Sequence, residues 1–307
     1  MKSITYLEAK NNPALILEIN ESFHDIEAKI YENNHPEIYS YEKDSWKKIF
    51  SKMKALTVDN GHITVLDIGT GVGFVPLAIA DLLTNEDTVI FSDISGAMLE
   101  QARKNTESYV FNKKFVLTKN SYDEFLDSSV DIVTLNSVLH HIADVTNLFK
   151  EVVRILKPGG VLIIKHEPNI RFSRNLVLSN IYKILQLIRK RNSNRSAPLN
   201  VIHLKTIKLL ESRGIVFMPE LTGPELQSLV DIHSPTATGF LDGSRGFDPY
   251  VLAPLLSSRA ELIECNTYGY FGKIRDDATN VRKCFSRLLR SVFPRDGYFF
   301  DVVIKKM

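Results

Sequence analysis

The sequence predicts a doubly wound α/β fold with a mainly parallel sheet, and three observations support this. From residue 63 onward, short β-branched runs alternate with stretches of helical periodicity. The runs are almost continuously apolar, as expected for strands that helices cover on both faces. Alternating strands and helices imply parallel strands joined by right-handed crossovers.

Five strands and three helices are expected in this alternating region. The strands are predicted at residues 63–68, 88–93, 114–118, 130–135 and 161–165, and the helices at residues 75–83, 97–105 and 145–156. The sequence Lys157-Pro158-Gly159-Gly160 predicts a sharp stop and a turn before the fifth strand.

The flanking segments show other patterns. Helices are expected within residues 13–57, at 169–191 as one amphipathic helix, at 204–212 and at 277–292. Residues 231–248 are rich in Gly, Ser, Asp and Pro, which predicts an ordered loop or lid. Residues 261–270 and 298–305 return to a β pattern and predict two further strands.

Composition argues against several classes of protein. The 307 residues are 44% apolar and 24% charged, as in ordinary soluble globular proteins. The net charge of +2 does not argue for nucleic-acid binding. Two cysteines argue against a disulfide framework and favour the reducing cytoplasm. No secretion signal, membrane-spanning run or zinc-type Cys/His spacing is evident, so no metal is expected.

The strongest motif is Val65-Leu66-Asp67-Ile68-Gly69-Thr70-Gly71-Val72-Gly73-Phe74, in which a strand leads through alternating glycines into a helix. Glycine is needed where φ is positive and where the backbone approaches a ligand closely. The helix N-terminus also offers unpaired N–H groups. This pattern predicts a ligand site at the turn.

Two acids narrow down the ligand. A dinucleotide fingerprint needs GxGxxG, but Pro76 stands at the position of its third glycine. Asp67 would repel a pyrophosphate, whereas it suits an ammonium group. Asp93 ends the next strand, where an acid can accept hydrogen bonds from both ribose hydroxyls; the alternative for Asp93 is a helix N-cap. The pattern favours a zwitterionic amino-acid nucleoside over a dinucleotide.

The stretch from Ile63 to Lys165 resembles the core of class I S-adenosylmethionine-dependent methyltransferases, in particular the small-molecule branch with the ubiquinone/menaquinone-type enzymes. The matching motifs are Asp67-x-Gly69-x-Gly71-x-Gly73, Asp93, Met98-Leu99-x-x-Ala102-Arg103 and Leu156-Lys157-Pro158-Gly159-Gly160. The resemblance covers about a third of the chain. It implies a seven-stranded Rossmann-like sheet whose last strand is antiparallel, completed by the two C-terminal strands.

The resemblance also implies a set of cofactor-binding residues for S-adenosyl-L-methionine. They are Asp67, Gly69, Thr70, Gly71, Gly73, Phe74, Asp93, Ile94, Met98, Asn120, Ser121 and Asn136. Many members of the family have Asp where Asn120 stands, but an amide oxygen can still accept a hydrogen bond from the adenine amino group. For Asn136, a plain turn residue is the equal alternative.

The candidate catalytic residues follow the strand ends, where open α/β sheets bind ligands. His140 and His141 follow the fourth strand, Glu167 follows the fifth, and His233 lies in the predicted lid. A base near the acceptor is the functional interpretation. Packing or helix capping is the alternative for the histidine pair, and ion pairing is the alternative for Glu167. We expect Glu167→Gln or His233→Ala to lower turnover and to spare cofactor binding.

A basic segment follows the core. Residues 165–208 contain ten Lys/Arg and one acid, Glu167. A solvated helix face is one interpretation. The other is an anionic acceptor or contact of a peripheral protein with an anionic membrane surface. Nucleic acid is the weaker alternative, because no aromatic stacking platform or RNA-binding motif is evident.

Together these patterns predict a helical N-terminal cap over residues 1–60, an S-adenosylmethionine-binding core over 61–166, a lid or acceptor-binding insertion over 167–258, and C-terminal strands over 259–307. We expect a cytoplasmic enzyme that methylates a small-molecule or lipid-linked metabolite on oxygen, nitrogen or carbon. Three alternatives stay open: an RNA or protein methyltransferase, a catalytically silent cofactor-binding module, and a nicotinamide-dependent oxidoreductase.

Overall fold

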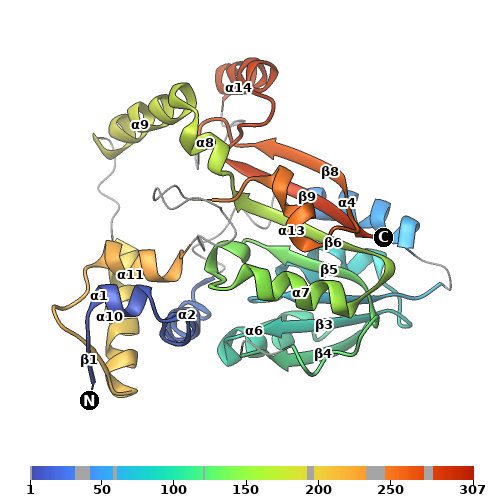
Figure 1. Ribbon diagram of the computed structural model, residues 1–307, viewed down its shortest axis with the longest axis horizontal. Helices are drawn as coiled ribbons and strands as arrows, with labels where there is room; N and C mark the ends of the chain where they lie inside the picture. The colour runs from blue at the N-terminus through green and yellow to red at the C-terminus, as the bar shows by residue number, and fades with distance from the viewer. Residues whose placement is uncertain are drawn as a thin grey trace.

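A seven-stranded sheet forms the centre of the molecule (Figure 1). The computed structural model describes residues 2–31, 42–57, 61–119, 122–191, 197–232, 246–272 and 279–307. The strand order is β4-β3-β2-β5-β6-β9-β8. The strands are β2 (Thr64–Ile68), β3 (Thr88–Asp93), β4 (Asn112–Leu117), β5 (Val130–Asn136), β6 (Leu156–Pro168), β8 (Ala260–Tyr268) and β9 (Phe299–Lys306). Strands β2 to β6 are parallel, and β9 is antiparallel to both neighbours, which confirms the predicted fold class.

Helices cover both faces of the sheet. On one face, α4 (Lys43–Thr57), α5 (Phe74–Ile79) and α6 (Gly96–Thr106) pack through an apolar cluster that includes Trp46, Val75 and Phe91. On the other face, α7 (Val145–Ile155) and α13 (Leu252–Leu256) pack through a cluster that includes Val133 and Phe149. Burial on both sides explains why the strands are apolar along almost their whole length.

A second, smaller apolar core lies beside the sheet. Strand β1 (Lys2–Ile4) pairs in parallel with β7 (Ile215–Phe217), and around them lie α1 (Tyr6–Lys10), α2 (Pro13–Glu27), α10 (Ala197–Ser212) and α11 (Gly223–Val230). Figure 1 shows these N-terminal and central segments side by side. Residues from the predicted N-terminal cap (1–60) thus pack together with residues from the predicted insertion (167–258). The β1–β7 pair was not predicted, because runs of three residues carry no periodicity.

The helix expected at 169–191 is divided. It forms α8 (Ile170–Arg174) and α9 (Leu176–Arg191), separated by Asn175. The Asn175 side chain accepts hydrogen bonds from the backbone N–H groups of Val177 and Leu178, as an N-cap does. Helix α9 shares an apolar cluster with α14 (Asn280–Val292).

The fifth strand is longer than predicted. Strand β6 begins at Leu156 and includes the Lys157–Gly160 stretch, where pairing with β5 is irregular and Gly159 has φ +77°. It continues to Pro168, so Glu167 pairs with Phe300 inside the sheet. Short 3-10 turns complete the described chain: η2 (Ala80–Leu82), η3 (Leu139–His141) and η4 (Pro249–Val251). None of the helices in the described ranges combines the length and hydropathy needed to cross a bilayer.

Candidate functional site

The glycine turn lies between β2 and α5 and has the geometry that its sequence predicts. Gly69, Gly71 and Gly73 have φ of +64°, +54° and +88°, a region that residues with a Cβ rarely adopt. A Cβ on Gly69 would lie 2.5 Å from Val138 Cγ2, so the segment after β5 packs directly on the turn. A Cβ on Gly71 would meet no atom within 4 Å. The turn therefore has an open side at Gly71.

Asp93 fixes the shape of this turn from the neighbouring strand. Its Oδ2 accepts a hydrogen bond from the Gly71 N–H at 2.8 Å, and its Oδ1 accepts one from the Ser95 N–H at 2.9 Å. The N-cap of α6 is Ser95, which excludes the cap role for Asp93. Burial raises the pKa of Asp93 above its ordinary value, although the backbone N–H groups oppose the rise. Each carboxylate oxygen retains a second lone pair for a ribose hydroxyl.

Asp67 is a buried carboxylate with one oxygen unpaired. Its Oδ1 accepts a hydrogen bond from Thr134 Oγ1 at 2.6 Å, whereas Asp67 Oδ2 and Thr70 Oγ1 are buried without a hydrogen-bond partner in the described parts of the chain. Burial raises the pKa of Asp67 to about 7, although the nearby Thr134 and Thr70 hydroxyls oppose the rise. Buried polar atoms without partners are rare in proteins. An amino-acid nucleoside with an ammonium group would fit here, because it brings the missing positive charge.

The other predicted cofactor residues have different surroundings. The Phe74 side chain is buried in the apolar cluster that α4, α5 and α6 share with the sheet, so only its backbone can contribute to the turn. Ile94 lies between Asp93 and the α6 N-cap, at the strand end. Asn136 Oδ1 accepts a hydrogen bond from Trp46 Nε1 at 2.9 Å. Asn120 and Ser121 lie outside the described residues.

Helix α2 covers the glycine turn. Its C-terminal end packs Ala28 against Val72 of the turn and Met98 of α6. One turn earlier, Asp25 Oδ1 accepts a hydrogen bond from Ser95 Oγ at 2.6 Å. The N-terminal helix thus lies over the edge of the sheet where the two acids are placed, a contribution that no sequence motif indicated.

Two strained residues lie close together, one just after β5 and one near the end of β6, where its pairing with β9 is irregular. Ser137 and His166 both have φ of +59°, although neither is glycine. The Ser137 N–H donates to Lys165 O, and Ser137 Oγ donates to His166 O at 3.1 Å. Such backbone strain occurs preferentially at functional sites. These strand ends face the same edge of the sheet as the glycine turn.

Glu167 connects the predicted catalytic residues. Its side chain is fully buried. Glu167 Oε1 accepts hydrogen bonds from the N–H groups of Val138 and Leu139, both at 2.6 Å, and Glu167 Oε2 lies 2.8 Å from His140 Nδ1. A carboxylate held in this way orients the 138–140 turn and the His140 ring rather than reaching an acceptor itself. The geometry gives Glu167 a positioning role.

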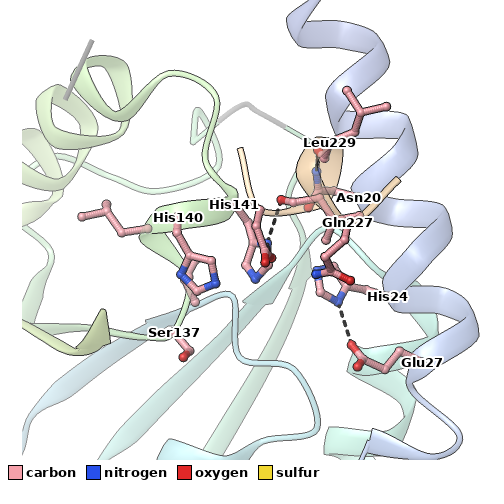
Figure 2. A network of polar contacts seen from close by, with 12 residues as sticks. Asn20, His24, Glu27, Ser137, His140, His141, Gln227 and Leu229 are labelled. Carbon is pink, nitrogen blue, oxygen red and sulfur yellow. Dashed lines mark hydrogen bonds and ion pairs between the residues drawn. The ribbon is translucent and has the colours of Figure 1, made fainter. Parts of the chain in front are cut away.

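His141 and His24 meet where α2 lies against η3 (Figure 2). Their rings pack edge to face with centroids 5.1 Å apart, and His141 Nδ1 lies 2.9 Å from Val230 O. Burial, followed by the proximity of His140 and His24, lowers the pKa of His141 well below 6.5. For His24, burial opposes protonation, but the hydrogen bond and charge of Glu27 prevail and raise its pKa. His24 therefore carries charge more readily than His141.

His166 belongs to another polar cluster. His166 Nδ1 lies 2.7 Å from Glu42 Oε1 and 3.1 Å from the Tyr268 hydroxyl, and its ring stacks on Phe299. Glu42 is buried and its Oε2 has no hydrogen-bond partner in the ranges that the structure covers. Neither Glu42 nor His24 was predicted, since both come from segments remote in sequence from the strand ends. His233 lies outside the described residues.

One group in the described ranges has the composition of a metal site. His140, His141 and Asp231 each bring one potential ligand atom within 4.8 Å of the others. Glu167 lies beside His140 Nδ1, and the Val230 carbonyl lies beside His141 Nδ1. No sequence pattern indicated this group, because Asp231 is about ninety residues from the histidines.

Part of this chain is similar to known methyltransferases. Residues 66–164 match the family model described as a methyltransferase domain. The ubiquinone/menaquinone biosynthesis C-methyltransferase UbiE of Rickettsia typhi is 31% identical over 123 residues, which are 38% of this chain and 48% of that protein. UbiE of Geotalea daltonii is 30% identical over 148 residues, 47% of this chain and 62% of that protein. The chain thus spans about half to two thirds of the length of these relatives.

A relative of another kind is similar over a stretch of comparable length. The polyketide synthase-nonribosomal peptide synthetase pyiS of Pyricularia grisea is 32% identical over 108 residues, which are 34% of this chain and 3% of that protein. The matched family segment contains the glycine turn, Asp93 and the histidine pair, and it ends just before Lys165. The predicted cofactor, S-adenosylmethionine, is confirmed at the level of this family. Over residues 66–164 the chain thus contains a methyltransferase domain and is similar to S-adenosylmethionine-dependent methyltransferases.

Proposed function

We propose that this protein transfers the methyl group of S-adenosylmethionine to a small-molecule or lipid-linked metabolite. The observation that carries the proposal is the pair of unpartnered buried atoms, Asp67 Oδ2 and Thr70 Oγ1, in the turn whose open side lies at Gly71. Buried polar and charged atoms that lack a partner in the described chain are expected of a site that receives a zwitterionic ligand.

Different residues of the site would contact different parts of the cofactor. Asp67 would pair with the ammonium group of the methionine part, and Asp93 would accept hydrogen bonds from the ribose hydroxyls. The open side of Gly71 admits the ligand next to the backbone. When bound, S-adenosylmethionine supplies an electrophilic methyl group on a positively charged sulfur.

The chain's own task is then to orient the acceptor, exclude water and remove a proton. We assign proton removal to His140, because the Glu167 carboxylate beside Nδ1 favours the tautomer with the proton on Nδ1 and leaves Nε2 as the acceptor. Val138 in the same turn packs on Gly69, which brings this unit next to the cofactor turn. Helix α2 covers the turn and limits the access of water.

The proposed class of acceptor is argued from the names of similar proteins and from the basic segment at residues 165–208. The UbiE proteins that this chain resembles are named for ubiquinone and menaquinone biosynthesis, and pyiS for polyketide and peptide synthesis. The ten Lys/Arg of residues 165–208 favour an anionic or lipid-linked acceptor over a neutral one. An RNA acceptor is the second candidate, and its binding would fall steeply with salt.

Two matched glycine variants test the proposal. Gly71 and Gly61 both have positive φ, and a Cβ added to either would meet no atom within 4 Å, so Gly71→Ala and Gly61→Ala introduce the same kind of backbone strain. Titration of S-adenosylhomocysteine by calorimetry should show at least a tenfold loss of affinity in Gly71→Ala and none in Gly61→Ala. Equal affinities in both variants, or no binding by the unaltered protein, would contradict the proposal.

Transfer is tested separately. The protein is incubated with methyl-labelled S-adenosylmethionine and with the lipid, small-molecule and RNA fractions of a cell extract. Label is expected in the lipid or small-molecule fraction and absent with Gly71→Ala. Label in RNA alone would establish the second candidate instead.

A further inference from the structure

Two helices at one end of the molecule carry apolar side chains on their solvent-exposed faces. Figure 1 shows α9 and α14 beyond α8 and β8, away from the small core around β1 and β7. The inner face of α9 (Leu178, Ile181, Tyr182 and Leu185) and of α14 (Leu289) packs into a shared cluster. In both helices the face that packs on the protein is therefore known, and the remaining face is exposed to solvent.

The outer side of α14 is a narrow apolar stripe. Val281, Phe285, Leu288 and Val292 recur at the spacing i, i+4, i+7, i+11, so they lie in one line along the helix. Their exposed fractions are 79%, 44%, 54% and 58% in that order. The inner residues Ser286 and Leu289 lie to one side of this line and are buried. The Phe285 ring stacks on Phe271, with centroids 6.0 Å apart. Packing within the described chain does not account for the exposure of Val281, Leu288 and Val292.

Helix α9 repeats this arrangement over a wider face. Leu176, Val177, Ile184, Leu187 and Ile188 are all more than half exposed. At 100° per residue these five side chains fall within about a third of the helix circumference. The amphipathic pattern at residues 169–191 includes Ile181 and Leu185 as well as Val177, Ile184 and Ile188. Of these, only Ile181 and Leu185 pack inward.

All charged residues of the two helices are basic. The segments Leu176–Arg191 and Asn280–Val292 contain eight Lys/Arg and no Asp or Glu. On α14, Lys283, Arg287 and Arg290 are exposed on the face that lies about 100° or more around the helix from the apolar stripe. An apolar face combined with cations on the polar face is typical of helices that lie in the interface of an anionic membrane.

We infer that α9 and α14 together form a surface that docks on anionic lipid bilayers, with the apolar stripes in the interface and the cations at the headgroups. Charge favours this occupant over a second copy of the chain. A symmetric dimer through this face would bring two sets of eight like charges together, and that repulsion opposes association. The inference does not depend on the proposed methyl transfer.

The test is co-sedimentation with lipid vesicles. The full chain is mixed with vesicles of phosphatidylcholine alone and of phosphatidylcholine with phosphatidylglycerol, at low and high salt. Binding is expected to the anionic vesicles and to fall at high salt. Ile184→Ser with Leu288→Ser should lower the bound fraction at least tenfold. The matched control, Val110→Ser with Leu126→Ser, alters apolar side chains elsewhere that are at least as exposed, and it should bind like the unaltered protein.

A second pair of variants tests the charges. Lys283→Glu with Arg287→Glu should abolish the preference for anionic vesicles, whereas Lys114→Glu with Lys150→Glu, which change exposed lysines on β4 and α7, should preserve it. Circular dichroism establishes that each variant is folded. Absence of vesicle binding, equal binding to both kinds of vesicle, or a mass that doubles with concentration and is restored to that of one chain by Leu288→Ser would overturn the inference.

Discussion

Replacing Asp67 by Asn should stabilise the ligand-free protein and weaken its binding of the cofactor. Asp67 is 1% exposed, and only one of its oxygens has a hydrogen-bond donor in the described part of the chain, Thr134. The pKa of the carboxyl is about 7 rather than 3.8, mainly because of burial. At about 1.4 kcal/mol per pH unit, holding it ionised costs on the order of 4 kcal/mol. The amide of the Asp67→Asn variant is neutral at every pH, so that cost would disappear.

The sign of the pH dependence follows from the direction of this change. Because the pKa of Asp67 is raised in the folded state, the folded protein keeps the proton to higher pH than the unfolded chain does. The unaltered protein should therefore lose stability as the pH rises from about 4 to about 7. The Asn variant should lack this component, and its advantage should be largest above pH 7, up to about 4 kcal/mol.

The assay is urea unfolding at pH 5 and pH 8, combined with calorimetric titration of S-adenosylhomocysteine. Loss of a charged hydrogen-bond partner, worth about 1.5–3 kcal/mol, predicts an affinity lower by about 10- to 100-fold. Asp131→Asn is the control, since Asp131 is paired with Lys157 and its replacement should destabilise the protein. If Asp67→Asn lost stability at pH 8 or retained full affinity, the reasoning about this carboxylate would be refuted.

Three further predictions concern the same edge of the sheet. Glu167→Gln places an amide donor among backbone N–H groups, so it should lower the free energy of unfolding by about 2 kcal/mol or more. It should also lower the rate of methyl transfer at saturating cofactor, because the His140 ring loses its carboxylate partner. Lowered stability with an unchanged transfer rate would contradict the proposed role of Glu167 in positioning His140. Because Glu27 raises the pKa of His24, the stability that His24 contributes should be greatest below about pH 6.5 and should decline at higher pH. The unfolding free energies of the protein and of His24→Gln should therefore converge between about pH 6 and pH 8. A constant difference between the two would contradict this prediction. Gly69→Ala should lower the melting temperature, because the added Cβ would clash with Val138. Adding Val138→Ala to this variant should restore part of the loss. If the double variant were no more stable than Gly69→Ala, backbone strain alone would be responsible.

The core of the fold was predictable because local signals agree there. The strands β2, β3 and β5 match the predicted ranges to within one residue, since buried parallel strands are continuous apolar runs between turn residues. The glycine turn was recognisable because its positive φ angles demand glycine. The division of 169–191 into two helices was missed, because an Asn is compatible with a helix interior until its side chain is seen capping the next helix.

Residues close together along the chain were enough to predict the doubly wound sheet, the cofactor family and the acids beside the glycine turn. The surroundings of these features emerged only when the chain was seen folded. His24 of α2 lies against His141, Glu42 pairs with His166, and Glu167 accepts hydrogen bonds from the backbone of the 138–140 turn. These contacts join segments that are far apart in sequence, and no local pattern specifies which distant side chain fills a given position. They depend on how the helices pack on the finished sheet.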